Sequence, residues 1–185
     1  MREIKTAIDI LMTNKNSVKI AIDGRCAAGK TTLANSLSTA YDSTIIHMDD
    51  FFLPLELRNK NRYAEPGGNI HYERFFEEVA CGLKSGNPFE YNILNCEKMK
   101  FCGAVQVQFT PLIIVEGTYA LRPEFRDLYD LKIFLDINPD EQKRRILERN
   151  GESEYQTFVK SWIPMEELYF RELDVTKFCN FVIFS

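Results

Sequence analysis

Residues 24–31 combine residue types and spacing that suit the binding of a polyphosphate. They read Gly24-Arg-Cys-Ala-Ala-Gly29-Lys30-Thr31 and fit G-x-x-x-x-G-K-[ST], the Walker A pattern, without a mismatch. Glycines let the backbone turn tightly, so that main-chain N–H groups can approach phosphate oxygens. In this pattern the lysine reaches the β- and γ-phosphates and the hydroxyl group ligates Mg²⁺. A glycine turn with a chance lysine is the alternative. The predicted nucleotide contacts are Gly24, Arg25, Cys26, Ala27, Ala28, Gly29, Lys30, Thr31 and Thr32.

Two carboxylates follow apolar runs that we expect to be strands. Asp49 comes directly after residues 44–48, and Glu116 follows residues 112–115. In an open parallel sheet, the carboxyl ends of the strands face the ligand crevice. Asp49 could take the proton from an acceptor hydroxyl that attacks the γ-phosphorus, or help to hold a metal ion. Glu116 could bind Mg²⁺ directly or through water.

Purely structural roles are open for the same acidic segments. Asp49 and Asp50 could cap the next turn, while Phe51 and Phe52 are predicted to enter the core. Of the two aspartates, Asp49 is favoured for chemistry. Glu116 could instead be a solvated residue at the end of a strand.

The apolar pattern along the chain predicts an α/β fold. Apolar runs that do not alternate suit parallel strands, because both faces of such strands are covered. Helical patterns lie between these runs, and this alternation argues for a doubly wound, three-layer architecture with a mostly parallel five-stranded sheet. The predicted strands cover residues 18–22, 44–48, 112–115, 131–135 and 181–184, and the predicted helices cover residues 2–13, 30–40, 72–84, 139–150 and 163–174.

Two connecting segments differ in character. Residues 53–70 are polar, contain a Pro-Gly-Gly turn, and are predicted to form a surface loop. Residues 86–110 contain the strand-like stretches "FEYNIL" and "AVQVQF", which suggest a hairpin near the acceptor site.

The composition limits the class of protein. The chain has 185 residues, 45% of them hydrophobic, which suits one domain with a real core. A formal net charge of −4 and a pI near 5.3 do not favour nucleic acid or an anionic membrane as partners. No apolar run reaches 20 residues, and the first residues lack the apolar region of a signal peptide. Five scattered cysteines and two histidines predict neither a zinc site nor a disulfide framework. We therefore expect a reduced, cytoplasmic protein.

As a set, these segments resemble the uridine kinase/phosphoribulokinase-like family of P-loop small-molecule kinases. The resemblance rests on "IAIDGRCAAGKTTLA", on "MDDFF", similar to the family's Asp-x-Phe-Tyr, and on "IIVEGTYAL", similar to its hydrophobic-Glu-Gly element. It continues through "FRDLYDLKIFLDINPDEQKRRILER" and "FVKSWIPMEELYF", from about residue 18 to the C-terminus. The resemblance implies a single P-loop NTPase domain over residues 1–185, with a helical lid at about 143–160.

The family resemblance implies a role for each residue that matches its motifs. Asp49 would be the catalytic base and a member of the metal shell, with Thr31 and Glu116 as the other Mg²⁺ partners. Lys30 would anchor the phosphates of ATP. Contact of Asp49 and Glu116 with the phosphate acceptor is also implied.

The family's lid arginines correspond to positions in "KRRILER", namely Arg145 and Arg149. Four residues apart on a helix, these side chains project from one face. Like charges there are unfavourable unless an anion joins them, and a transferring phosphoryl group is such an anion. The alternative pairs Glu141 with Arg145, and Arg144 with Glu148, on a solvated face.

The acceptor pocket is where this sequence departs from the family. "His71-Tyr-Glu73-Arg-Phe75" stands where uridine kinases carry His-Pro-Asp-x-Phe, so Glu73 would replace the acid that holds the ribose hydroxyls, with His71 beside it. Tyr91 resembles the family's base-stacking tyrosine. Cys96 stands where the family has a hydrogen-bonding histidine, which puts pyrimidine recognition in doubt.

The leading hypothesis is transfer of the γ-phosphoryl group of MgATP to a hydroxyl of a small molecule, with a nucleoside as the favoured acceptor. Pantothenate, nicotinamide riboside or a sugar phosphate are alternative acceptors, and a non-catalytic ATP-binding regulatory protein is the alternative from another class. A GTPase loses support because "NKNS" and "NKNR" lack the aspartate of the guanine-reading Asn-Lys-x-Asp. The expectation of a homo-oligomer comes from the family resemblance alone.

Overall fold

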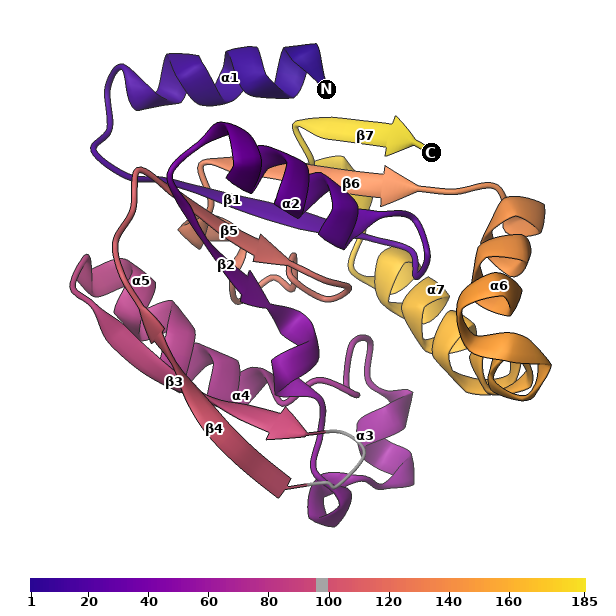
Figure 1. The fold of residues 1–185 in the computed structure, drawn as a ribbon. Coiled ribbons are helices and arrows are strands. Elements are labelled where there is room, and N and C mark those ends of the chain that lie inside the picture. Colours follow the sequence, from indigo (N-terminus) through magenta and orange to yellow (C-terminus); the bar gives the residue numbers. More distant parts are fainter. Residues whose placement is uncertain (96–99) are drawn as a thin grey trace.

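A parallel β-sheet of five strands forms the centre of the molecule (Figure 1). The computed structural model describes residues 1–95 and 100–185. The strand order is β2-β5-β1-β6-β7, and each neighbouring pair is parallel. The strands are β1 (Val18–Gly24), β2 (Ser43–His47), β5 (Leu112–Glu116), β6 (Leu131–Asp136) and β7 (Phe181–Phe184). The predicted five-stranded α/β fold is therefore confirmed.

The central strands are apolar on both faces because helices cover the sheet on both sides. Ile20 and Ile22 of β1 belong to one apolar cluster, whereas Ala21 between them belongs to the other. On β5, Ile114 points to the first cluster and Val115 to the second. The alternation of strand side chains thus fills two cores at once, which explains the continuous apolar runs in the sequence.

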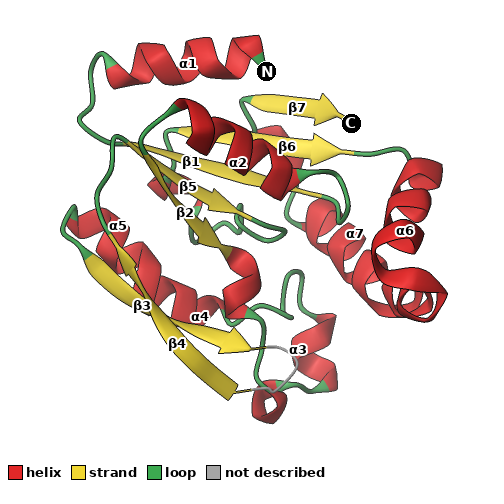
Figure 2. Cartoon of the chain, in the orientation of Figure 1, coloured by secondary structure: helices red, strands yellow, loops and turns green. Residues whose placement is uncertain are grey.

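Two helices cover one face of the sheet. These are α1 (Arg2–Met12), which buries Ile4 and Ile8, and α2 (Lys30–Ala40), which buries Leu33 and Leu37. Both agree with the predicted helices at residues 2–13 and 30–40. Figure 2 shows these helices on the side of the sheet opposite α4 and α5.

On the other face, the helix predicted for residues 72–84 is divided into three parts. It comprises α4 (Tyr72–Phe75), a π-helical stretch (Phe76–Ala80) and α5 (Cys81–Ser85). The predicted hairpin is confirmed as β3 (Phe89–Asn95) and β4 (Lys100–Val107), paired antiparallel. It packs beside these helices and forms a sheet of its own.

Helices α6 and α7 lie beyond the carboxyl ends of the strands (Figure 1). Helix α6 (Pro139–Thr157) extends past the predicted end at residue 150, with a non-helical break at Gly151. A π-helical stretch (Phe158–Trp162) joins it to α7 (Ile163–Glu172). In the part of the chain that the structure describes, no helix has the length and apolarity needed to cross a lipid bilayer.

The prediction of a surface loop at residues 53–70 is partly wrong. This segment contains helix α3 (Lys60–Ala64), and its last four residues, 67–70, are buried. The guanidinium group of Arg62 explains the burial, because it donates hydrogen bonds to the carbonyls of Gly68 (2.9 Å) and Ile70 (3.0 Å). The polar composition of residues 53–70 indicated a solvent-exposed loop, although the end of this segment is buried and hydrogen-bonded to Arg62.

Candidate active site

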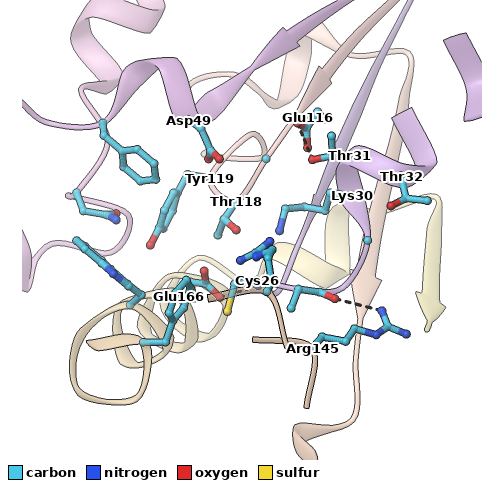
Figure 3. A pocket seen from close by; sticks show the side chains of 18 of the residues that line it. Cys26, Lys30, Thr31, Thr32, Asp49, Glu116, Thr118, Tyr119, Arg145 and Glu166 are labelled. Carbon is cyan, nitrogen blue, oxygen red and sulfur yellow. Dashed lines mark hydrogen bonds between the residues drawn. The ribbon is translucent and has the colours of Figure 1, made fainter. Parts of the chain in front are cut away.

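A cavity with a volume of about 740 Å³ lies at the carboxyl ends of the central strands. Figure 3 shows Asp49 and Glu166 on opposite sides of this cavity, with Thr118 and Tyr119 between them. Of the predicted nucleotide contacts, Gly24, Arg25 and Ala28 are absent from its lining. The predicted residues that do line it are Cys26, Ala27, Gly29, Lys30, Thr31, Thr32, Asp49, Glu116, Arg145 and Arg149.

The phosphate-binding loop connects β1 directly to α2. Gly24 has a φ of 139°, and a Cβ atom there would lie 2.1 Å from the carbonyl oxygen of Leu135, so only glycine fits this close approach. Helix α2 begins at Lys30, whose Nζ donates hydrogen bonds to the carbonyls of Gly24 (2.8 Å) and Arg25 (2.9 Å). The ammonium group is therefore folded back over the loop, next to the positive end of the helix dipole.

A buried carboxylate that the sequence interpretation missed fixes the start of this loop. Asp23 accepts hydrogen bonds from the N–H groups of Gly24 (2.6 Å) and Leu121 (2.9 Å), and from the hydroxyl of Tyr169 (2.7 Å). Burial raises the pKa of Asp23, while these hydrogen bonds oppose the shift. Asp23 thus ties the loop both to the segment after β5 and to α7.

Two of the three predicted metal ligands, Thr31 at the start of α2 and Glu116 at the end of β5, lie side by side. The Thr31 hydroxyl lies 3.1 Å from Oε1 of Glu116, and Nδ1 of His47 lies 2.6 Å from the same oxygen. The hydrogen bond with Glu116 raises the pKa of His47. Mg²⁺ binds through one or two protein oxygens plus phosphates and water, so a hydroxyl and a carboxylate beside a phosphate loop fit this ion. His47 is opposite Glu116 in the strand register, a relation that the sequence could not reveal.

The two neighbouring aspartates point to different parts of the molecule. Asp49 faces the cavity, and the surrounding protein raises the pKa of its carboxyl by desolvation, which the charge of Lys30 opposes. Asp50 instead accepts a hydrogen bond from the hydroxyl of Tyr91 (3.0 Å). Arg74 also donates to the backbone carbonyl of Asp50. Only Asp49 of this pair lines the cavity.

Of the residues predicted to contact the acceptor, Asp49 and Glu116 line the cavity, whereas Glu73, His71 and Tyr91 do not. Tyr91 is 1% exposed and packs against the ring of Phe51, so it does not offer a stacking face there. Glu73 forms two hydrogen bonds of 2.7 Å with Arg62, and His71 caps α4 by accepting from the N–H of Arg74. Cys96 lies outside the described residues. Their placement does not support the predicted contacts of Glu73, His71 and Tyr91.

Both interpretations of the arginines on α6 find support. Arg145 pairs with Glu141 (2.7 Å), and it also donates to the carbonyl of Ala27 in the phosphate loop (3.1 Å; Figure 3). Arg149 lines the cavity as well. Arg144 turns to solvent, where it pairs with Glu141 and Glu148. The helix therefore presents Arg145 and Arg149 to the site and Arg144 to water.

Helix α7 supplies a carboxylate that the sequence interpretation did not single out. Glu166 is 6% exposed, and it accepts a hydrogen bond of 2.9 Å from the N–H of Cys26 in the phosphate loop. Burial raises the pKa of Glu166, and the charge of Lys30 opposes the shift. On the same side, Gln142 of α6 donates to the carbonyl of Cys26 (3.1 Å). No sequence pattern marks these contacts, because they depend on how α6 and α7 pack on the loop.

The prediction that Phe51 and Phe52 both enter the core is right for the first residue only. Phe51 is fully buried, whereas Phe52 lines the cavity with its ring centroid 6.5 Å from that of Trp162. Asn69 and Tyr119 also line the cavity. The cavity therefore has an aromatic side in addition to its phosphate-loop side.

Comparison with known proteins finds sequence relatives named uridine kinase, while similar solved structures also include a D-glycerate 3-kinase from Cryptococcus neoformans. No family model matches the chain. Uridine-cytidine kinase D from Dictyostelium discoideum is 30% identical over 129 residues, which is 69% of this chain and 25% of that protein. A uridine kinase from Clostridium botulinum (strain Okra / Type B1) is 29% identical over 142 residues, or 68% of this chain and 65% of that protein. The chain thus spans a quarter of the first relative and just under two thirds of the second.

A solved structure extends the similarity to nearly the whole chain. It is described as a possible uridine kinase from Bacillus stearothermophilus, and it matches with a TM-score of 0.69 at 20% identity. The match covers 98% of this chain and 99% of that one, which shows a common fold. The sequence relatives support a place in the uridine kinase/phosphoribulokinase-like family of P-loop kinases, and the shared fold agrees with it.

Proposed function

We propose that the protein is an ATP-dependent kinase that transfers the γ-phosphoryl group to a hydroxyl of a small molecule. A nucleoside is the favoured acceptor. The observation that carries the proposal is one cavity that holds the phosphate loop, the candidate base Asp49 and the oxygen pair of Thr31 and Glu116. The relatives named uridine kinase support a nucleoside as the acceptor.

The phosphate-loop side would hold the triphosphate. Loop N–H groups and the N-terminus of α2 attract the anion, and Lys30 is already folded over the loop where it can exchange a carbonyl for a phosphate oxygen. Arg145 and Arg149 reach the same cavity and would neutralise charge on the transferring group. Mg²⁺, held by Thr31 and Glu116, would supply further positive charge beside the phosphates.

The opposite side would hold the acceptor next to Asp49. As the acceptor oxygen attacks the γ-phosphorus, its O–H bond breaks and Asp49 takes the proton. The new O–P bond forms while the bond to the β–γ bridging oxygen breaks, which leaves ADP. The raised pKa of Asp49 makes it a stronger base than an ordinary aspartate. Closure of the cavity excludes water that would otherwise hydrolyse ATP.

The test is to incubate the purified chain with MgATP and a pool of nucleosides and vitamins, and to identify phosphorylated products by mass. We expect one nucleoside to gain a phosphate. Asp49→Asn should lower kcat by about 10³-fold, the usual contribution of a positioned base, with nearly unchanged affinity for ATP. Asp50→Asn is the matched control, because this neighbouring carboxylate faces Tyr91 and not the cavity.

Two results would contradict the proposal. Equal losses of kcat in Asp49→Asn and Asp50→Asn would remove the special role of Asp49. The absence of any phosphorylated acceptor, together with a nucleotide-dependent change of oligomeric state, would instead favour an ATP-binding regulatory protein.

A further inference from the structure

Two buried polar atoms in the cavity have no hydrogen-bond partner among the described residues. They are Oδ1 of Asn69, a residue that is 4% exposed, and the hydroxyl of Tyr119, a residue that is 2% exposed. Burial raises the pKa of the Tyr119 phenol, and the neighbouring Asn69 opposes this shift, yet neither polar atom has a partner at hydrogen-bond geometry among the described residues. Buried polar atoms are almost always paired in folded proteins, and leaving them unpaired costs free energy. Both residues line the cavity, so a ligand there could supply the missing partners.

The backbone holds both side chains firmly in place. The carbonyl of Asn69 accepts a hydrogen bond from the N–H of Leu53 (3.0 Å), which fixes the buried end of the 53–70 segment. Tyr119 has a φ of 82°, which is unfavourable for a residue with a side chain, and its ring packs against that of Tyr169 at 4.9 Å. Local backbone strain of this kind is concentrated at functional sites. Figure 3 shows the phenol reaching into the cavity between Asp49 and Glu166.

Two aromatic rings lie next to these polar atoms. Phe52 pairs with Ile70 in an isolated antiparallel bridge, which places it beside Asn69 in the fold. Its ring and that of Trp162 are inclined by 38° and line the same cavity. Apolar walls with a few fixed polar groups are the usual composition of small-molecule sites. Flat rings suit such walls, because they bury a large apolar face while their edges stay polar.

We propose that the subsite for the phosphate acceptor is formed by Asn69, Tyr119, Phe52 and Trp162. The molecule that binds there carries a planar ring with a hydrogen-bond donor and a hydrogen-bond acceptor side by side. This inference rests on the proposed kinase function. An asparagine amide offers one acceptor and one donor group, which matches the amide edge of a pyrimidine or the carboxamide of a pyridine. The phenol of Tyr119 supplies a second polar contact. Glu73 and Tyr91, which the family pattern favours, are engaged by Arg62 and Asp50 instead.

The only tryptophan of the chain is Trp162, so intrinsic fluorescence reports on this subsite directly. The first experiment titrates the nucleotide-free protein with uridine, cytidine and nicotinamide riboside, and with ribose and pantothenate as compounds that lack a planar ring. We expect a saturable change of emission with at least one of the ring compounds and none with the other two. A response to pantothenate alone, or to no compound, would overturn the subsite.

The second experiment compares variants by the same titration and by the KM for the acceptor. Asn69→Ala and Tyr119→Phe should each weaken acceptor binding by about tenfold or more, with an unchanged KM for ATP. Tyr129→Phe is the matched control, since its hydroxyl is also buried without a partner but does not line the cavity. Tyr119→Phe should not lower Tm, because its hydroxyl stabilises nothing in the free protein.

The two proposals fail in different ways. If the chain phosphorylates a nucleoside while Asn69→Ala and Tyr119→Phe keep the wild-type KM and Glu73→Gln raises it, the subsite is wrong and the kinase stands. If ring compounds change the emission and both variants abolish that change, but no phosphorylated product forms with MgATP, the subsite stands and the kinase is wrong.

Discussion

Glu166 is a carboxylate that occupies a position beside the anion-binding loop. Its hydrogen bond with the N–H of Cys26 stabilises the loop, yet its negative charge would repel the phosphates proposed to bind there. Lys30 attracts the carboxylate of Glu166, and it would attract the phosphates as well. The side chain of Glu166 and the proposed nucleotide would therefore compete for the positive charge of Lys30.

We predict that Glu166→Gln lowers the KM for MgATP several-fold at and above neutral pH. The amide keeps a hydrogen-bond acceptor for Cys26 and removes the charge. The pKa of Glu166 is raised by burial, so the wild-type side chain is protonated at low pH and then resembles glutamine. The difference between the two proteins should shrink as the pH falls, which a series of KM measurements would show.

Glu167→Gln provides the control for this prediction. Glu167 is the next residue, but it pairs with Arg25 (2.9 Å) and does not line the cavity. Its substitution should leave the KM for MgATP unchanged. An unchanged or higher KM in Glu166→Gln at every pH would show that this carboxylate does not oppose nucleotide binding.

At the scale of elements, the segment from α6 to α7 brings both sides of the cavity together. Arg145 and Arg149 lie before the break at Gly151, whereas Trp162 and Glu166 lie after it. The angle at Gly151 therefore sets the position of the proposed phosphate contacts relative to the proposed acceptor wall. We infer that this segment acts as the lid expected from the sequence.

A glycine pair offers a test of this role. Gly151 (φ 80°, ψ 174°) and Gly86 (φ 72°, ψ 10°) both have positive φ, and a Cβ atom at either would meet nothing within 4 Å. Replacing either residue by alanine should cost about 1–3 kcal/mol of stability through backbone strain alone. Only Gly151→Ala should also raise KM and lower kcat, because Gly86 ends α5 away from the cavity. Thermal unfolding and steady-state kinetics measure the two effects, and equal kinetics in both variants would exclude the lid role.

At the scale of the whole molecule, nucleotide binding should stabilise the fold. A ligand that binds only the folded state at about 100 times its Kd adds about 2.7 kcal/mol. For a chain of this size, that corresponds to an increase in Tm of about 5–10 °C. We predict this increase with Mg²⁺ and a non-hydrolysable ATP analogue, and a smaller one when a chelator removes Mg²⁺. Lys30→Ala should lose most of the increase, and a full increase in that variant would contradict the proposed nucleotide site.

The sequence predicted the sheet well because buried parallel strands leave continuous apolar runs, and it predicted the phosphate loop because the pattern fixes residue types at fixed spacing. The contacts of Glu73 and Tyr91 could not be predicted in this way. Their positions along the chain were informative, but only packing decides that Tyr91 turns toward Asp50 and Glu73 toward Arg62.

The proposed acceptor side could not be predicted from local sequence patterns. Asn69 comes from a segment whose polarity indicated a surface loop, and Tyr119 follows β5 in a strained conformation without periodicity. Trp162 reaches the cavity only because α6 and α7 fold back over the strand ends. Contacts between segments that are distant in sequence decide this part of the site.

The hydrogen bond between Tyr169 and Asp23 attaches α7 to strand β1 of the sheet. Glu166 lies about one helical turn before Tyr169, and Trp162, at the end of the preceding π-helical stretch, lies about two turns before it, so one continuous helical segment carries both side chains. If a ring binds at Trp162 as proposed and shifts this helical segment, Glu166 would shift relative to the phosphate loop, so the two proposed substrate sites would be coupled through α7.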